Sequence, residues 1–199
     1  MEWILASNNE KKLKELREIL GDMGITVRSQ REAGCNFEVD ETGETFAENA
    51  RLKAEAVTRA TGKAAIADDS GLCVEALDGR PGVHSARYGP PGATDAEKYT
   101  LLLKELRGKE NRRARFVSSI CCTFPNGDVL TAEGVCEGEI LPAPRGSGGF
   151  GYDPVFLVSG LGRSMAELTP EEKNAVSHRG NALRLFRQRL EEYLAANGE

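Results

Sequence analysis

Three acidic side chains of this 199-residue chain stand where carboxylates could bind a divalent metal ion. Asp68 and Asp69 directly follow the short apolar run from Ala64 to Ala67, and Glu41 lies in a polar segment before a predicted helix. Mg²⁺ prefers such oxygen ligands and often contacts substrate phosphates as well. Adjacent acidic residues are commonly a solvated turn, but a pair that follows apolar residues is rarely fully exposed. We therefore predict a metal site for phosphate chemistry, with the acidic pair at the carboxyl end of a strand.

A polar run after the first apolar segment is suited to a polyphosphate. Its first and fourth residues have the S-x-x-E spacing of a capping box that opens a helix. A helix amino terminus offers unpaired N–H groups and a partial positive charge, which bind anions. An ordinary capped helix with solvated lysines has the same pattern, so the run is a weak signal by itself. Its residues are Ser7, Asn8, Asn9, Glu10, Lys11 and Lys12.

Two further sets of polar residues have both a structural and a functional interpretation. Lys53 falls inside a predicted helix, where a lysine is more often a surface residue than a ligand. Ser177, His178 and Arg179 precede an amphipathic stretch, and paired hydrogen-bond donors at that place could read the edge of a nucleobase. A capping role for Ser177, with His178 and Arg179 exposed, is equally consistent with the sequence.

Covalent catalysis has no support in the sequence. The chain contains no G-x-S-x-G motif, and Cys121 and Cys122 lie inside a predicted strand instead of an electropositive loop. No Walker loop is present either. Metal-assisted hydrolysis is the chemistry that remains.

The elements that must position these residues alternate between strands and helices. Apolar runs predict strands at 2–6, 25–29, 64–67, 114–124, 128–137 and 155–158. Capping signals and helical spacing predict helices that start at Ser7, Thr45, Thr94 and Thr169, and a closing amphipathic helix that contains Leu194. Asn126-Gly127 between two predicted strands indicates a hairpin, so the sheet is mixed. The glycine-rich segment 142–154 is a loop whose backbone can approach a ligand closely.

Composition limits the classes of protein and of partner. Hydrophobic residues make up 40% and charged residues 29%, as in a globular domain. A net charge of -5 and only 6% aromatic residues argue against nucleic-acid binding. No apolar run of about 18 residues and no basic leader is present, so we expect no membrane contact and a cytoplasmic location. Five cysteines without a C-x-x-C pair indicate reduced, buried thiols.

Five short motifs, taken in order, resemble the inosine triphosphate pyrophosphatase family, whose members act on inosine and xanthosine triphosphates. The resemblance extends from about Ile4 to Leu194, and the ordered combination is highly specific although each motif is short. The motifs are Ser7-Asn8-Asn9-x-x-Lys12, Glu41-x-Gly-x-Thr45-Phe46-x-Glu48-Asn49-Ala50, Asp68-Asp69-Ser70-Gly71, Gly148-Gly149-Phe150-Gly151-Tyr152-Asp153-Pro154 and Ser177-His178-Arg179.

This resemblance implies a fold and an assembly. The expected fold is α/β, an elongated mixed β-sheet flanked by helices, with two lobes and a nucleotide-binding groove between them. One nucleoside triphosphate pyrophosphatase domain would occupy residues 1–199, and the assembly would be a homodimer.

The resemblance also implies roles for individual residues. By this resemblance, Asp69 corresponds to the family's proton acceptor, and Glu41 and Asp69 correspond to its Mg²⁺ ligands. The triphosphate would bind to Ser7, Asn8, Asn9, Glu10, Lys11, Lys12, Lys53 and Ser70. The nucleobase would bind to Phe150, Gly151, Tyr152, Asp153, Lys173, His178 and Arg179.

The implied reaction is attack of water on the α phosphorus, which releases the monophosphate and pyrophosphate and so removes ITP, dITP and XTP from the nucleotide pool. Three alternatives stay open. A Maf-like pyrophosphatase would prefer pyrimidine or modified nucleotides, a nucleotide-binding regulator would show no turnover, and a single-stranded nucleic-acid binder would show salt-sensitive oligonucleotide binding. The motifs that contain Phe150 and His178 argue against the first alternative.

Overall fold

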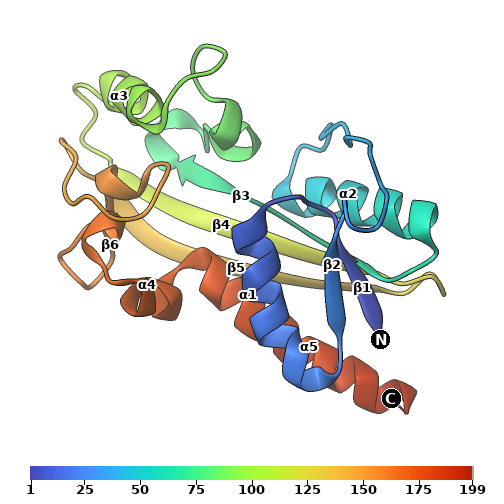
Figure 1. The fold of residues 1–199 in the computed structure, drawn as a ribbon. Helices are drawn as coiled ribbons and strands as arrows, with labels where there is room; N and C mark the ends of the chain where they lie inside the picture. Colours follow the sequence, from blue (N-terminus) through green and yellow to red (C-terminus); the bar gives the residue numbers. More distant parts are fainter. Residues whose placement is uncertain (199) are drawn as a thin grey trace. The chain divides into compact units, whose positions relative to one another are not determined.

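A six-stranded mixed sheet and five α-helices form the computed structural model, which describes residues 1–198 (Figure 1). The strands are β1 (Glu2–Leu5), β2 (Thr26–Ser29), β3 (Ala65–Val74), β4 (Arg113–Thr123), β5 (Val129–Ile140) and β6 (Phe156–Val158). The helices are α1 (Glu10–Leu20), α2 (Phe46–Thr61), α3 (Asp95–Glu105), α4 (Pro170–Val176) and α5 (His178–Asn197). The strand order is β2-β1-β3-β4-β5-β6. Strand β1 is parallel to β2 and β3, and β6 is antiparallel to β5, which confirms the predicted α/β class with a mixed sheet.

The chain divides into two compact units, and it passes between them several times. Unit 1 comprises residues 1–69, 119–133 and 182–199, and unit 2 comprises residues 70–118 and 134–181. The division falls inside strands β3, β4 and β5 and near the start of α5. Each unit has a hydrophobic core of its own.

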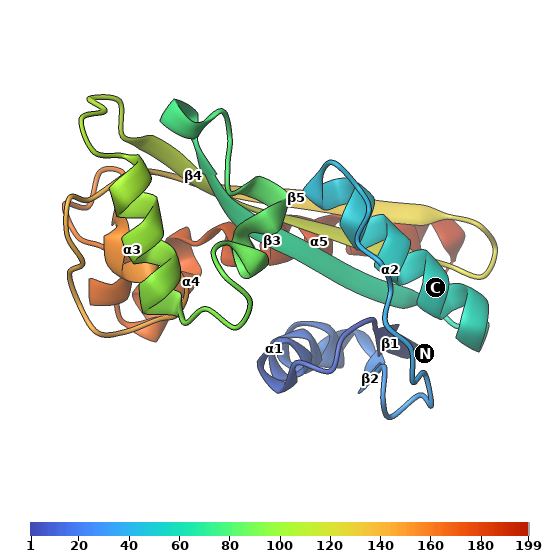
Figure 2. The same cartoon turned by 90° about the horizontal axis from the view of Figure 1, so that it is seen from above.

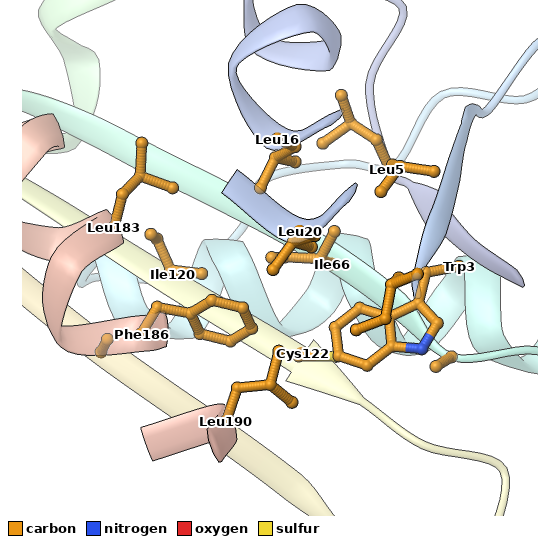
Figure 3. Packing of buried hydrophobic residues seen from close by; sticks show 14 of the residues in the cluster. Trp3, Leu5, Leu16, Leu20, Ile66, Ile120, Cys122, Leu183, Phe186 and Leu190 are labelled. Atoms are coloured by element: carbon orange, nitrogen blue, oxygen red, sulfur yellow. The ribbon is translucent and has the colours of Figure 1, made fainter. Parts of the chain in front are cut away.

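Hydrophobic clusters of unit 1 lie on both faces of its strands. Side chains alternate between the faces of a strand, so Trp3, Leu5 and Ile66 pack with α1 and α5, while Ile4 and Ala65 pack with α2. Figure 2 shows α1 and α2 on opposite sides of β3. Figure 3 shows the first cluster, in which leucines of α1 and α5 and Phe186 meet Ile120 and Cys122 of β4. Small alanines on α2 allow this helix to lie close to the sheet.

Unit 2 has a core that includes several aromatic rings. Phe116 of β4 contacts Phe156 of β6 with ring centroids 4.4 Å apart, and Leu102 of α3 is fully buried in the same cluster. The chain continues from β6 into a 3-10 turn, Met165–Glu167, in which Met165 is also buried. These contacts hold in place the 3-10 turn against which the glycine-rich loop before β6 packs.

The start of α1 differs from the predicted capping box. Asn9, and not Ser7, is the N-cap, because the Asn9 side chain accepts hydrogen bonds from the amides of Lys11 and Lys12. The Ser7 hydroxyl instead accepts a hydrogen bond from the Asn9 amide at 3.1 Å. An asparagine caps a helix as well as a serine does, so the N-cap lies two residues later than the S-x-x-E spacing predicts.

Strand β3 is longer than predicted, and this corrects the expected place of the acidic pair. The strand does not end at Ala67 but continues to Val74, so Asp68 and Asp69 lie within the strand instead of at its carboxyl end. The polar residues 68–71 interrupt the apolar pattern, and Leu72 and Val74, both fully buried, restore it in the core of unit 2.

Other predictions from the sequence are confirmed. Strands β4 and β5 are neighbours in the sheet, and a turn at 124–128 joins them, with the Gly127 amide donating to the Phe124 carbonyl at 3.0 Å. Helix α5 buries Leu183, Phe186, Leu190 and Leu194 as its spacing predicts. The five cysteines are free thiols, four of them buried and Cys73 half-buried. Within residues 1–198, no helix has both the length and the apolar composition that crossing a membrane requires.

Candidate functional site

Lys53 of α2 lies among three acidic residues of unit 1. Its Nζ donates to the backbone carbonyl of Asp68 at 2.7 Å, and it lies 3.6 Å from Glu41 Oε2 and 3.6 Å from Asp69 Oδ1. Only 17% of the Lys53 side chain is exposed, so this lysine is not the surface residue that helix position alone would favour. A cation between two carboxylates reduces their mutual repulsion and lets both stay close together.

Asp69 is the most perturbed group of this cluster. Burial raises its pKa from 3.8 to about 6, and the negative charges of Glu41 and Asp68 act in the same direction, whereas Lys53 and a hydrogen bond with Asn49 oppose the rise. Its Oδ2 atom is buried and has no hydrogen-bond partner within residues 1–198. A buried polar atom without a partner is uncommon in folded proteins and calls for an explanation, such as a bound ion.

Asn49 positions the loop that carries Glu41, a role that the sequence did not reveal. Its Oδ1 accepts from the Gly43 amide at 2.8 Å, and its Nδ2 donates to the Gly43 carbonyl at 3.5 Å. A Cβ at Gly43 would lie 2.7 Å from that Oδ1, so only glycine fits at this position of the loop. The sequence feature that marks this role is an asparagine on the alanine-rich face of α2, and the structure shows that its side chain is fully buried.

Asp68 faces the opposite side of β3 from Asp69. Neighbouring side chains in a strand point to opposite faces, and Asp68 accordingly meets Lys12 of α1, whose Nζ lies 3.0 Å from Oδ1 and 2.9 Å from Oδ2. The structure therefore places the two carboxylates in separate surroundings, Asp68 with α1 and Asp69 with α2.

The loop before α1 is held in place by its own polar groups. Asn8 accepts from the Arg31 amide at 2.9 Å, and the N-cap oxygen of Asn9 occupies two amides of the first turn. Glu10 and Lys11 are exposed, and within the described residues no hydrogen bond or ion pair joins either side chain to Asp69 or Lys53. Of the six predicted phosphate-binding residues in the segment 7–12, the structure brings Lys12 to Asp68.

The donor set of unit 1 fits a magnesium ion. Residues 1–198 hold no cluster of three or more His, Cys, Asp or Glu side chains arranged around a metal position. Mg²⁺ does not need one, because it commonly takes one or two carboxylates and completes its shell with water and substrate phosphates. Glu41 and Asp69 could supply two hard oxygen ligands, and the buried Oδ2 of Asp69 has no hydrogen-bond partner within residues 1–198.

The second group of predicted site residues lies in unit 2, around an exposed aromatic ring. Phe150 is 66% exposed, and Lys173 Nζ lies 4.4 Å from the centroid of its ring. The same ammonium contacts Asp153 Oδ2 at 2.6 Å, and this oxygen also accepts from the Phe150 amide at 3.1 Å. Burial raises the pKa of Asp153, and the Lys173 charge opposes the rise. Phe150, Asp153 and Lys173 thus form one connected group.

The glycines before Phe150 are required by close packing. A Cβ at Gly149 would lie 2.2 Å from Asp153 Oδ2, and the positive φ of 72° is itself unfavourable for other residues. A Cβ at Gly148 would lie 2.8 Å from the carbonyl oxygen of Ala166, which accepts from the Gly148 amide. The loop is therefore seated on the 3-10 turn Met165–Glu167, with the Phe150 ring outward.

Two side chains from other parts of unit 2 hold the next two residues of this loop. The Tyr152 hydroxyl donates to the carbonyl of Ser85 at 2.7 Å, and burial raises the pKa of Tyr152. The Gly151 amide donates to Asp95 Oδ2 at 2.8 Å. Neither Ser85 nor Asp95 was predicted from the sequence as a site residue.

The remaining predicted residues lie at the start of α5 and in β3. Ser177 is buried and its hydroxyl accepts from the Gly180 amide at 3.0 Å, which confirms its capping role. His178 and Arg179 are half-buried instead of exposed, and the His178 ring stacks on Phe116 with centroids 4.8 Å apart. Ser70 is exposed on β3.

The fold defines an α/β protein. Its carboxylates and lysines are suited to binding a metal ion and phosphates, and its exposed aromatic ring, bordered by a lysine, is suited to a planar ligand. The chain belongs to the Ham1 family, whose model matches residues 3–189.

Several relatives are similar over nearly their whole length. The chain is 48% identical over 192 residues to a Bacillus subtilis protein named dITP/XTP pyrophosphatase, with 96% of this chain and 97% of the relative covered. It is 49% identical to a protein of the same name from Nostoc, with 98% and 97% covered. Among solved structures, the Staphylococcus aureus Ham1 protein has a TM-score of 0.93 and 42% identity, with 97% of this chain and 100% of that chain covered. The predicted family is therefore confirmed.

Proposed function

We propose that this protein hydrolyses the non-standard purine nucleoside triphosphates ITP, dITP and XTP to the monophosphate and pyrophosphate in a magnesium-dependent reaction. The names of its relatives support the substrate class. The observation that carries the chemistry is the buried Asp69, whose Oδ2 has no partner within residues 1–198 and whose neighbours are Lys53 and Glu41.

In this proposal Asp69 accepts the proton of the water that attacks the α phosphorus. A base works best when its pKa lies near the working pH, and in the metal-free protein the surroundings of Asp69 raise its pKa to about 6. The new bond joins the water oxygen to the α phosphorus, and the bond to the bridging oxygen of the β phosphate breaks. Pyrophosphate carries away the electron pair of that bond.

Glu41 and Asp69 would hold Mg²⁺, which supplies neutralisation of the negative charge on the phosphate oxygens. Lys53 and Lys12 would each bind phosphate oxygens with an ammonium group. In the structure both lysines are already held by acidic partners, so their positions are fixed before substrate binds. This preorganisation lowers the cost of ordering charged side chains around the triphosphate.

The purine would bind against Phe150, with Lys173, His178 and Arg179 as sources of hydrogen-bond donors. Inosine and xanthosine carry an oxygen acceptor at the six-position, whereas adenosine carries an amino donor there. A pocket lined by donors rejects the amino group, because a buried donor would then lack a partner. As further parts of the proposal, the protein acts in the cytoplasm as a homodimer.

The test is pyrophosphate release from ITP, XTP, GTP, ATP and dTTP, each with Mg²⁺ and with excess EDTA. We expect rapid release from ITP and XTP that EDTA abolishes. Preference for dTTP would contradict the proposed base selectivity and favour a Maf-like activity. No release from any of the five would contradict the proposed catalysis.

A further inference from the structure

Asp95 ties the loop with the exposed phenylalanine to a helix far away in the sequence. Asp95 is the first residue of α3, and its Oδ2 accepts a hydrogen bond of 2.8 Å from the amide of Gly151, 56 positions along the chain. An acidic residue in the first turn of a helix ordinarily serves the helix dipole. In α3 the capping is carried out by Thr94 and Glu97, which form a reciprocal capping box, so the Asp95 carboxylate is available for the loop.

The loop needs outside support at this point. Gly149 and Gly151 both have positive φ angles, 72° and 61°, in a segment without regular secondary structure. The Asp153 side chain holds the Phe150 amide from within the loop, and Tyr152 reaches the Ser85 carbonyl on its far side. Between these two supports, the Gly151 amide has Asp95 as its partner.

The contact with Asp95 is adjacent to the residues that would touch a base. Phe150 directly precedes Gly151, and its ring is 66% exposed with Lys173 beside it. A hydrogen bond from an amide to a carboxylate is charge-assisted and stronger than a neutral one. The negative charge of Asp95 also acts on the neighbouring loop groups, because it helps to raise the pKa of both Tyr152 and Asp153.

We propose that Asp95 is a positioning residue for nucleobase recognition, which holds the Gly151 backbone and thereby the Phe150 ring and its lysine partner in a binding-ready arrangement. This inference rests on the proposed function. Asp95 determines how tightly the purine binds and leaves the rate of phosphate chemistry unchanged, because its hydrogen bond and the effects of its charge act on the loop of unit 2.

The test compares Asp95→Ala and Asp95→Ser with Asp95→Asn in the full-length protein with Mg²⁺. Asparagine keeps an acceptor oxygen at the same reach, whereas serine suits a helix start but is too short to reach the loop. The matched control is Glu97→Ala, which weakens the same helix turn without touching Gly151. The readouts are KM and kcat for ITP and XTP, the Kd for inosine monophosphate by calorimetry, and the melting temperature.

We expect the alanine and serine variants to raise KM and the Kd about 10-fold, the loss of one charge-assisted hydrogen bond, with kcat within about twofold of wild type. Asp95→Asn should restore most of the affinity, and Glu97→Ala should lower the melting temperature without raising KM. Unchanged KM and Kd in both truncations, or an equal KM rise in Glu97→Ala, would overturn the role of Asp95 while the proposed function stands. A wild-type protein without selectivity for ITP and XTP would overturn the proposed function, and this inference with it.

Discussion

Lys12 and Asp68 form an ion pair on the face of β3 opposite to Asp69, with Lys12 Nζ 2.9 Å from Asp68 Oδ2. The pair joins the first turn of α1 to the strand that carries the proposed base. Since Asp68 has Lys12 beside it and Asp69 has Lys53, two adjacent carboxylates receive different surroundings from two helices. Alternation along one strand is sufficient to separate their roles.

Asp69→Asn should stabilise the metal-free protein at neutral pH while it abolishes activity. The folded-state pKa of Asp69, about 6, lies above the ordinary value of 3.8. A raised carboxyl pKa adds stability below pH 3.8, and that stability is lost as the pH rises through about 6, where the buried group becomes charged. The variant should therefore gain up to about 3 kcal/mol over wild type well above pH 6, and most of this gain should be absent near pH 4.

Urea unfolding in EDTA at pH 4.0 and pH 7.5 measures this difference. Turnover of ITP by the same variant should fall by about 100-fold to 10,000-fold, the usual cost of losing a general base. A gain in stability that is equal at both pH values would contradict the assigned pKa, and near-native turnover would contradict the role of Asp69 as base.

Asn49→Ala should destabilise the protein by about 2 kcal/mol and also reduce activity, because it leaves the Gly43 amide without its partner and releases the loop that carries Glu41. The matched control is Asn8→Ala, which also removes an asparagine oxygen that accepts from a backbone amide, at an exposed position. We expect a smaller stability loss for the control. Chemical denaturation checks both variants and ITP turnover checks Asn49→Ala, and an equal stability loss in the two variants would contradict the special role of Asn49.

Two adjacent serines of β4 should respond differently to replacement by alanine. Ser118 Oγ is buried without a hydrogen-bond partner among residues 1–198, whereas Ser119 Oγ donates to Glu133 Oε2 at 2.8 Å. Ser118→Ala removes an unsatisfied group and should change the free energy of unfolding by less than about 0.5 kcal/mol or increase it, while Ser119→Ala should cost about 1 to 3 kcal/mol. Equilibrium urea unfolding decides, and a larger cost for Ser118→Ala would show that its hydroxyl has a partner.

Gly149→Ala should raise KM for ITP, because the new Cβ would lie 2.2 Å from Asp153 Oδ2 and would displace the loop. Gly160→Ala is the control, since Gly160 also has a positive φ, 79°, but a Cβ there meets no atom within 4 Å. Both variants should lose about 1 kcal/mol of stability from backbone strain. Steady-state kinetics should separate them, and the same KM in both would contradict the importance of the Gly149 contact.

The elements with strong local signals were predictable from the sequence. The spacing of Leu183, Phe186, Leu190 and Leu194 predicts α5, and the Asn126-Gly127 turn predicts the hairpin, because both depend on residues close together in the chain. The predicted end of β3 was wrong because residues 68–71 break the apolar pattern of the strand. Its continuation to Val74 depends on packing in the core of unit 2. The predicted N-cap of α1 was wrong because Asn9, two residues after Ser7, is equally able to cap the helix and takes the N-cap position.

The site was only partly predictable for a related reason. Glu41 and Asp69 were named from motifs and Lys53 from the family resemblance. The position of Lys53, 3.6 Å from both carboxylates, depends on packing between α2 and β3. The contact between Asp95 and Gly151 spans 56 positions and leaves no local pattern in the sequence. Side-chain contacts at such separations follow from the fold and become visible only with it.

The position of bond cleavage tests the central claim most directly. Turnover of ITP in water enriched in oxygen-18, followed by mass spectrometry of the products, shows which phosphorus the water attacks. We predict one heavy oxygen in inosine monophosphate and none in pyrophosphate, since attack occurs at the α phosphorus. Label in pyrophosphate, or release of orthophosphate with inosine diphosphate, would contradict the proposed reaction.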